Sequence, residues 1–231
     1  MAATRARATP KPTPKSKARL PGAARWRRRK DARPGEILDA AVACFAERGF
    51  AATRLDDVAA RAGITKGTLY LYFSGKEELF KAVVRHWITA NIARAETAVA
   101  GATATTPELL AQLVANWLEI FTTTPAGVLP KLIIAEAGNF PELARFYYDE
   151  VVTRGTRLIG GLLRRGIERG EFDVALDLDH AVFCIISPVL MNALWRHSLA
   201  PYAPRVIDGE RLARTHLALL LDGLRRKGAS R

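Results

Sequence analysis

The sequence predicts an all-α protein, because helical patterns run through most of the chain and strand patterns are missing from it. No segment of the 231 residues alternates apolar and polar side chains between turn signals, as a half-buried strand would. The twelve prolines fall mostly in the N-terminal tail or at plausible helix boundaries. We therefore expect three parts: an arm (1–33), a small three-helix domain (34–81) and a larger helical domain (82–231).

Apolar spacing and helix-boundary residues predict the helices in order. The first starts at or near Pro34 and ends at Gly49, since glycine is a natural helix stop. Two short helices follow on either side of Gly63. The next begins at a capping box formed by Ser74 and Glu77 and continues to about residue 100. Further helices are expected at 107–121, 128–137, 142–169, 178–197 and 210–226.

The formal charge of +12 is concentrated at the N-terminus. Residues 1–33 contain twelve Lys or Arg and a single acidic residue, Asp31. The Pro, Lys, Ala and Thr content of this arm cannot build a core, so we expect a disordered, solubilising extension. The alternative is that the basic cluster Arg25–Lys30 tracks phosphates or enters a minor groove of a nucleic acid.

Residues 53–80 form the most informative segment, which reads as two short helices around Gly63. Thr53 is a good N-cap for the first, and Asp56 could complete a variant capping box. The positions that share the inner, apolar face are Leu55, Val58, Ala59, Ala62, Leu69 and Phe73. The outward positions of the second helix are Lys66, Thr68, Tyr70 and Tyr72. A helix-turn-helix needs this division between a packing face and a DNA-facing one, whereas the alternative is an ordinary helical corner within a core.

The same segment resembles a known family. GITKGTLYLYFSGKEELF (63–80) is similar to the DNA-binding signature of the TetR (tetracycline repressor-like) transcriptional regulators, and the resemblance is specific over roughly residues 34–81. It implies a three-helix helix-turn-helix domain followed by a larger helical domain for ligand binding and dimerisation. The positions that it assigns to DNA are Thr53, Thr65, Lys66, Gly67, Thr68, Tyr70, Leu71, Tyr72 and Lys76.

The implied contacts differ along this segment. Thr53 and Thr65 stand at helix N-termini, where hydroxyl and N–H groups can hold phosphates. Lys66 and Thr68 stand near the start of the recognition helix, and this is the end that meets base edges. Gly67 allows close approach of the backbone to the DNA. The two tyrosines are expected to reach phosphates or a thymine methyl group, and the lysine at 76 a phosphate. The leucine at 71 contacts a base or nothing.

The resemblance also implies a homodimer on double-stranded operator DNA and a small-molecule effector. Segments 181–195 and 212–224 are the expected dimer surface, although the first could be simply a core helix. The expected lining of an apolar ligand site is Trp117, Phe121, Phe140, Phe146, Tyr147 and Phe183. Each of these side chains could instead belong to the ordinary core. No cluster of Arg or His suggests a strongly anionic effector.

Other classes of protein find little support. The chain has no G-x-S-x-G, P-loop, H-E-x-x-H or C-x-x-C motif, so no enzyme and no cofactor are predicted. His180 and Cys184 share a helix face without an obvious third metal ligand beyond the nearby Asp177. Both Cys44 and Cys184 are expected to be buried thiols. With no signal peptide and no apolar run long enough to span a bilayer, we expect a cytoplasmic protein.

The sequence thus predicts a TetR-type DNA-binding regulator, a repressor released from its operator by a small, largely apolar effector. Two alternatives remain open. One is a sequence-indifferent basic DNA-binding protein that depends on the arm. The other is a helical small-molecule carrier or enzyme that has no role on DNA.

Overall fold

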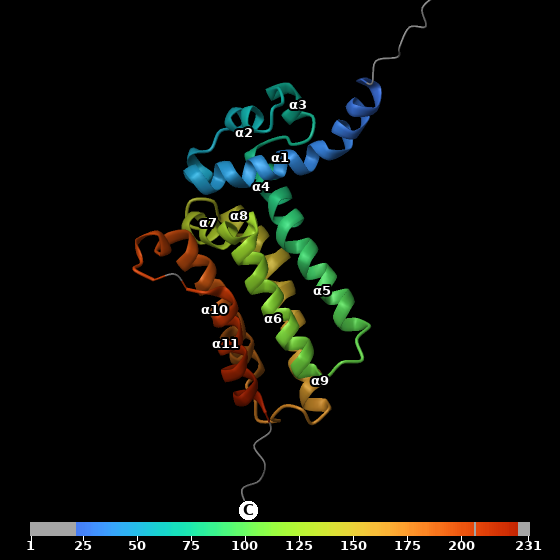
Figure 1. Cartoon of the computed structure of the whole chain (residues 1–231), viewed down its shortest axis with the longest axis vertical. Coiled ribbons are helices and arrows are strands. Elements are labelled where there is room, and N and C mark those ends of the chain that lie inside the picture. Colours follow the sequence, from blue (N-terminus) through green and yellow to red (C-terminus); the bar gives the residue numbers. More distant parts are fainter. Residues whose placement is uncertain (1–21, 206, 226–231) are drawn as a thin grey trace, which may run out of the picture. The chain divides into compact units, whose positions relative to one another are not determined.

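The computed structural model describes residues 22–205 and 207–225, with side chains from residue 34 onward. All regular elements in this part of the chain are helices, so the all-α prediction is confirmed (Figure 1). By its internal contacts the chain divides into two units, residues 1–33 and residues 34–231. Most of the predicted arm, residues 1–21, lies outside the described residues.

The first helix, α1 (Gly22–Ala52), begins well before Pro34, so the predicted start of this helix is wrong. Residues 22–33, expected as part of a disordered arm, are rich in alanine, arginine and lysine, which have high helix propensity. The helix bends at Gly49, whose φ of 78° lies in the left-handed region that glycine adopts readily. The predicted helix stop at Gly49 is therefore confirmed as a break in the helix, although helical residues continue to Ala52.

The helical elements after α1 follow the predicted order. They are α2 (Leu55–Arg61), α3 (Lys66–Tyr70), α4 (Lys76–Val84), η1 (Arg85–Thr89), α5 (Ala90–Ala100), α6 (Thr106–Thr123), η2 (Pro125–Val128), α7 (Leu129–Glu136), α8 (Pro141–Tyr147), η3 (Tyr148–Val152), α9 (Thr153–Glu168), α10 (Leu178–Ser198), η4 (Ala200–Tyr202) and α11 (Gly209–Leu224). The π-helical turns η1 and η3 interrupt two predicted long helices. The predicted capping box before α4 is wrong, because the N-cap is Gly75 and makes no side-chain hydrogen bond.

A cluster of aromatic rings holds the N-terminal helices together. Phe45, Phe50 and Phe80 are at most 1% exposed, and their ring centroids lie 5.3 to 5.6 Å apart. Phe50 also meets Phe140, immediately before α8, edge to face at 4.8 Å. The predicted boundary after residue 81 falls inside α4, so one continuous helix belongs to both predicted domains.

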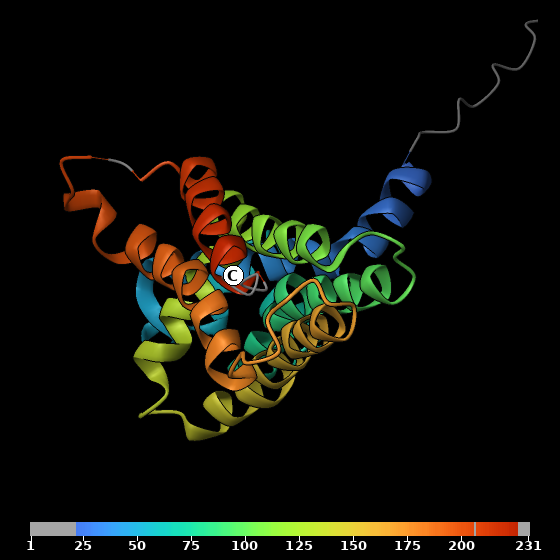
Figure 2. The same ribbon diagram turned by 90° about the horizontal axis from the view of Figure 1, so that it is seen from below.

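Helix α6 packs against α9, α10 and α11 in the larger helical part (Figure 2). Helix α10 packs in addition against α7 and α9. One face of α10 is buried through Val182, Ile185 and Val189, whereas Phe183 and Met191 are exposed by 75% and 61%. The helix thus contributes to the core and still presents apolar side chains outward.

Helix α10 is long and apolar enough to cross a membrane, judged by length and composition alone, which corrects the expectation that no apolar run has this length. Within the described residues, α6 together with the bent η2–α7 segment passes the same test as a pair. The packing of α10 on α6, α7 and α9 accounts for one apolar face of the helix, and 28% of its apolar window is buried.

Candidate DNA-binding and ligand-binding sites

The turn between α2 and α3 has the geometry that the sequence predicts. Gly63 has a φ of 64°, a left-handed conformation that side chains with a Cβ rarely adopt. Its N–H donates to the carbonyl of Ala60 at 3.2 Å, and the next N–H, of Ile64, donates to the carbonyl of Ala59 at 3.0 Å. These bonds end α2 and direct the chain into α3.

Helix α3 has the two faces that a recognition helix needs. Leu69 is fully buried and anchors the helix on the core. Tyr70, Leu71 and Tyr72 are exposed by 47%, 84% and 41%. At the start of the helix, the Thr65 hydroxyl caps the chain by accepting from the N–H of Thr68 at 3.2 Å. The predicted division of faces and the predicted cap at Thr65 are both confirmed.

Lys66 and Thr68 are held at this end of α3 by local contacts. The Lys66 ammonium lies 3.0 Å from Asp56 of α2, and both side chains are exposed. The hydrogen bond to Asp56 raises the pKa of Lys66 above its usual range, so the side chain stays charged. The two hydroxyls of Thr65 and Thr68 lie 2.9 Å apart. Because an exposed ion pair is weak and screened by salt, a phosphate can replace Asp56 as the partner of Lys66.

The predicted role of Thr53 is wrong. Its side chain is only 2% exposed, and its hydroxyl donates to the carbonyls of Gly49 at 2.6 Å and Cys44 at 3.2 Å. The N-cap of α2 is instead Arg54, whose N–H donates to Asp57 at 3.3 Å. The capping interaction is therefore shifted by one residue from the predicted pair. Thr53 closes the end of α1 and offers no hydroxyl to DNA.

Lys76 is also directed inward. Its ammonium donates to the carbonyls of Phe50 at 2.7 Å and Ala51 at 2.8 Å and lies 4.6 Å from the Phe50 ring centroid. Burial lowers the pKa of this ammonium from its usual value. The last carbonyls of a helix lack partners within the helix and attract a cation. In this structure Lys76 therefore caps α1, and its predicted contact with a phosphate is not the geometry observed.

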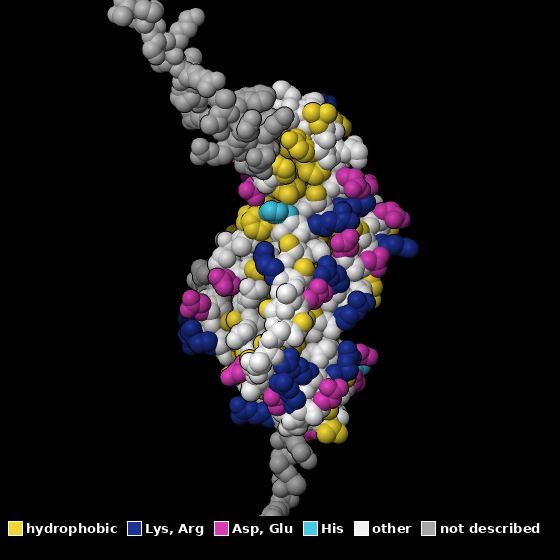
Figure 3. All heavy atoms as spheres, turned by 90° about the vertical axis from the view of Figure 1, so that its right-hand side faces the viewer, with side chains coloured by type: hydrophobic (Ala, Val, Ile, Leu, Met, Phe, Trp, Pro, Cys, Tyr) yellow, Lys and Arg dark blue, Asp and Glu magenta, His cyan; other side chains and the backbone are white. Residues whose placement is uncertain are grey.

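Charge is spread over the helical body. On the face shown in Figure 3, basic and acidic side chains are interspersed and do not gather into one basic patch. This agrees with the sequence, in which residues 34–231 carry a net charge of only +1. Electrostatic attraction of DNA by this face is therefore too weak to replace specific contacts between α3 and the DNA.

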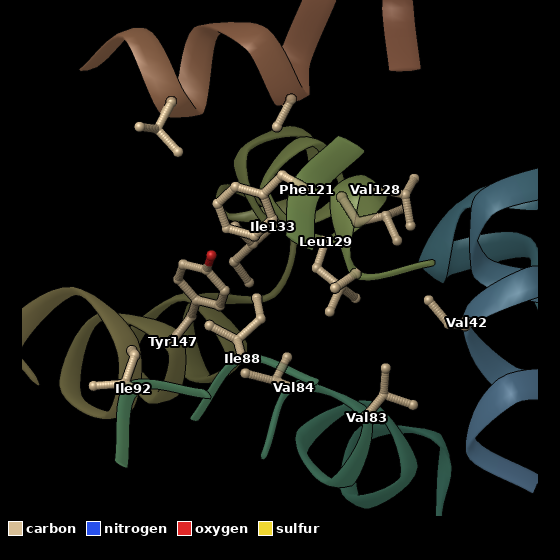
Figure 4. Close-up of a cluster of buried hydrophobic side chains, with 14 of the residues drawn as sticks. Val42, Val83, Val84, Ile88, Ile92, Phe121, Val128, Leu129, Ile133 and Tyr147 are labelled. Atoms are coloured by element: carbon tan, nitrogen blue, oxygen red, sulfur yellow. The ribbon is translucent and has the colours of Figure 1, made fainter. Parts of the chain in front are cut away.

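A cavity of about 580 Å³ lies among η1, α5, α6, α8, η3, α9 and α10. Four of the six predicted ligand residues line it: Trp117, Phe121, Tyr147 and Phe183. Figure 4 shows the Tyr147 ring extending towards Phe121 near the isoleucines at 88 and 92. The volume is that of a site for a small organic molecule.

The other two predicted ligand residues do not line this cavity. Phe140 packs edge to face on Phe50, with a centroid distance of 4.8 Å. The ring of Phe146 lies beneath the guanidinium of Arg85, at 4.9 Å, and near the ammonium of Lys81, at 5.9 Å. Both predictions are wrong, because Phe140 precedes α8 and packs on Phe50, whereas Phe146 of α8 packs against the cations of Arg85 and Lys81.

The sequence prediction missed most of the cavity wall. The further apolar lining residues are Trp87, Ile88, Ile92, Ile120, Val151, Val152, Leu178, Val182, Ile186, Val189 and Leu190. Arg157 and Arg164, both exposed, also line it, together with Asp179. The two arginines stand seven residues apart on α9 and so share a face. The same spacing is also typical of the solvated face of an amphipathic helix, so the sequence alone did not reveal a cationic rim.

The candidate metal residues form no complete site. His180 Nδ1 lies 2.8 Å from Asp177, which caps α10. No group of three His, Cys, Asp or Glu side chains that could hold a metal occurs within 34–205 and 207–225. Cys44 is buried as predicted, whereas Cys184 is exposed, which corrects the expectation that both thiols are buried.

Comparison with known proteins matches both parts of the chain. The family model described as "Bacterial regulatory proteins, tetR family" matches residues 37–83, and the "Tetracyclin repressor-like, C-terminal domain" matches residues 103–209. The transcriptional repressor KstR2 of Mycobacterium tuberculosis is 31% identical over 199 residues, which are 86% of this chain and 96% of that protein.

Two solved structures share the fold over nearly their whole length. The regulator FadR from Bacillus subtilis, solved in complex with stearoyl-CoA, has a TM-score of 0.70 and 25% identity, covering 82% of this chain and 98% of that one. The ketosteroid regulator KstR2 of Mycobacterium tuberculosis has a TM-score of 0.67 and 27% identity, covering 84% and 96%. From the recognition helix, the helical body and these relatives, we conclude that the chain belongs to the TetR family of bacterial transcriptional regulators.

Proposed function

We propose that this protein is a homodimeric TetR-type repressor, which binds operator DNA through α3 and is released by a small effector. One observation carries the proposal: the helix that leaves the DNA-binding domain forms a wall of the cavity. Leu79 and Phe80 of α4 are buried in the core, and Trp87 and Ile88 of η1 line the cavity. A molecule in the cavity thus contacts the same helical segment that packs in the core of the DNA-binding domain.

Two further contacts tie the DNA-binding domain to the larger domain. The N–H of Ala51, at the end of α1, donates to the carboxylate of Glu136 in α7 at 3.2 Å. The Phe50 and Phe140 rings meet at 4.8 Å. A shift of α4 has to alter these contacts and the placement of α3. An effector that prefers the DNA-incompetent state ~100-fold would supply about 2.7 kcal/mol for this change.

The proposed dimer surface is the outer side of α10 and α11. Phe183 and Met191 of α10 and Leu219 of α11 are exposed by 75%, 61% and 73%. Apolar exposure of this kind on adjacent helices is typical of a surface that a second copy covers. A two-fold dimer would place two α3 helices at half-sites about one helical turn of DNA apart, or a multiple of it.

The proposed effector is an acyl thioester of coenzyme A, acting in the cytoplasm. FadR, one of the structural relatives, was solved with stearoyl-CoA. In this chain, the apolar cavity would take the acyl group, and Arg157 and Arg164 at its rim would pair with the phosphates. This revises the expectation of a largely apolar effector, for which no cluster of Arg or His in the sequence suggested a strongly anionic group.

A gel-shift assay tests the proposal. The probe is the DNA upstream of the protein's own gene, with random DNA of equal length as competitor and stearoyl-CoA as effector. We expect preference for the upstream DNA and release by stearoyl-CoA. Equal affinity for both DNAs would indicate the sequence-indifferent binder, and no DNA binding would indicate the carrier or enzyme. An Arg157→Gln, Arg164→Gln double variant should keep DNA binding and lose most of the response to stearoyl-CoA.

A further inference from the structure

The cavity wall contains one buried phenol whose chemistry the proposed function does not use. Tyr147, the last residue of α8, is 8% exposed and lines the cavity. Its hydroxyl makes no hydrogen bond to any residue in the described part of the chain, 34–205 and 207–225. The oxygen is not among the fully shielded polar atoms, and Tyr147 lines the cavity, so an acceptor on a ligand in the cavity can reach the hydroxyl.

The surroundings of Tyr147 are apolar. Figure 4 shows its ring, with the oxygen at the tip, extending towards Phe121 in the neighbourhood of Ile88 and Ile92. Burial raises the pKa of the Tyr147 phenol well above its usual value. The group therefore stays neutral and can donate its proton in a hydrogen bond.

A second donor lies in the same wall. The indole N–H of Trp87 in η1 is shielded from solvent and has no acceptor within the described residues. Asn91 of α5, which also lines the cavity, does not accept from it, because the Asn91 nitrogen donates to the carbonyl of Trp87 and the Asn91 oxygen accepts from Arg94. Two neutral donors thus belong to a mostly apolar wall without an acceptor among the described residues, but the Trp87 N–H is shielded, so Tyr147 is the donor that a ligand can reach.

We propose that the buried part of the effector carries a neutral hydrogen-bond acceptor, a ketone or hydroxyl oxygen, and that Tyr147 donates to it. This inference rests on the proposed function, since it assumes that the cavity takes the effector. It refines the acyl group of the proposed coenzyme A thioester, because an acyl group with an oxygen in its buried part should bind more tightly than the plain hydrocarbon chain of stearoyl-CoA. Tyr147 is then the residue that sets this selectivity.

A matched pair of probes tests the inference without knowledge of the natural effector. Cyclododecanone and cyclododecane have nearly the same shape and differ in one carbonyl oxygen. Their affinities are measured by calorimetry for the full-length protein and for Tyr147→Phe, which removes only the hydroxyl. Tyr148→Phe is the control, because the neighbouring tyrosine is 61% exposed and does not line the cavity.

We expect Tyr147→Phe to weaken binding of the ketone about 10-fold and to leave binding of the hydrocarbon unchanged. The control variant should bind both probes as the unmodified protein does. Equal effects of Tyr147→Phe on both probes, or no effect on the ketone, would overturn the inference and leave the proposed function standing. If neither probe binds the unmodified protein, the cavity takes no apolar ligand, and the effector part of the proposed function fails together with the inference.

Discussion

Replacement of Lys76 by methionine separates two roles that this side chain could have. In the structure its ammonium donates to two carbonyls at the end of α1, at 2.7 and 2.8 Å, and covers the Phe50 ring. Lys76→Met keeps the aliphatic stem and removes the charge. A hydrogen bond to a charged group contributes about 1.5–3 kcal/mol when water is excluded. Water can reach the exposed carbonyl of Ala51 and replace the lost hydrogen bond there. We therefore expect Lys76→Met to lower the free energy of unfolding by roughly 1–2 kcal/mol in total.

Urea denaturation measures this loss, and Lys66→Met is the matched control. Lys66 lies on the outward face and pairs only with the exposed Asp56, so its variant should keep its stability and lose operator affinity. The reasoning is refuted if Lys76→Met unfolds at the same urea concentration as the unmodified protein. It is refuted more strongly if the salt slope of operator binding then falls by about 0.9, because that result would identify Lys76 as a phosphate contact.

Three other outcomes follow from the structure. Leu69→Ala removes a fully buried side chain and should cost roughly 2–5 kcal/mol in urea denaturation, whereas Leu71→Ala, at 84% exposure, should change stability by less than about 0.5 kcal/mol. A Cβ at Gly166 would lie 2.1 Å from a ring carbon of the buried Phe172, so Gly166→Ala should lower the thermal midpoint of unfolding. The space at Gly161 is open, so Gly161→Ala should raise or maintain this midpoint. Burial lowers the pKa of His197 in the folded state below its usual value of 6.5, and the neighbouring positive charges of Arg196 and Lys131 lower it further. The unfolded state therefore binds the proton more readily, and stability should fall as the pH drops below about 6.5; His197→Gln should reduce this dependence in urea titrations at pH 5 and 7.

Local patterns predicted the recognition helix well. The spacing of Leu69 from the outward Tyr70 and Tyr72 defines two faces within one short helix, and Gly63 marks the turn by its backbone conformation alone. Both features depend on residues that are close together in the sequence, so local spacing is enough to predict them.

Interactions between distant segments explain the wrong predictions. Thr53 and Lys76 were assigned to DNA, and the structure instead points both at the carbonyls that end α1. Phe140 was assigned to the ligand and packs on Phe50, ninety residues earlier in the chain. Sequence spacing carries no information on which of several aromatic or cationic side chains meets a cavity and which meets another helix.

The arginine rim was missed for the same reason. Arg157 and Arg164 look like ordinary solvated residues of an amphipathic helix until α10 and η1 are placed beside them. Their potential to bind an anion depends on the cavity that they border, and that cavity exists only in the folded chain.

The most direct test of the central claim is the operator affinity of Tyr70→Ala, with Tyr202→Ala as the control. Tyr70 lies on the outward face of α3, whereas Tyr202 is 86% exposed in η4 of the larger domain. The operator is first located by footprinting on the DNA upstream of the protein's own gene. If Tyr70 contacts base edges, its loss should weaken operator binding by about 1–3 kcal/mol, roughly 5- to 150-fold. The affinity for random DNA should change little. The control should bind as the unmodified protein does. Unchanged operator affinity in Tyr70→Ala, or equal losses on operator and random DNA, would contradict sequence reading by this helix face.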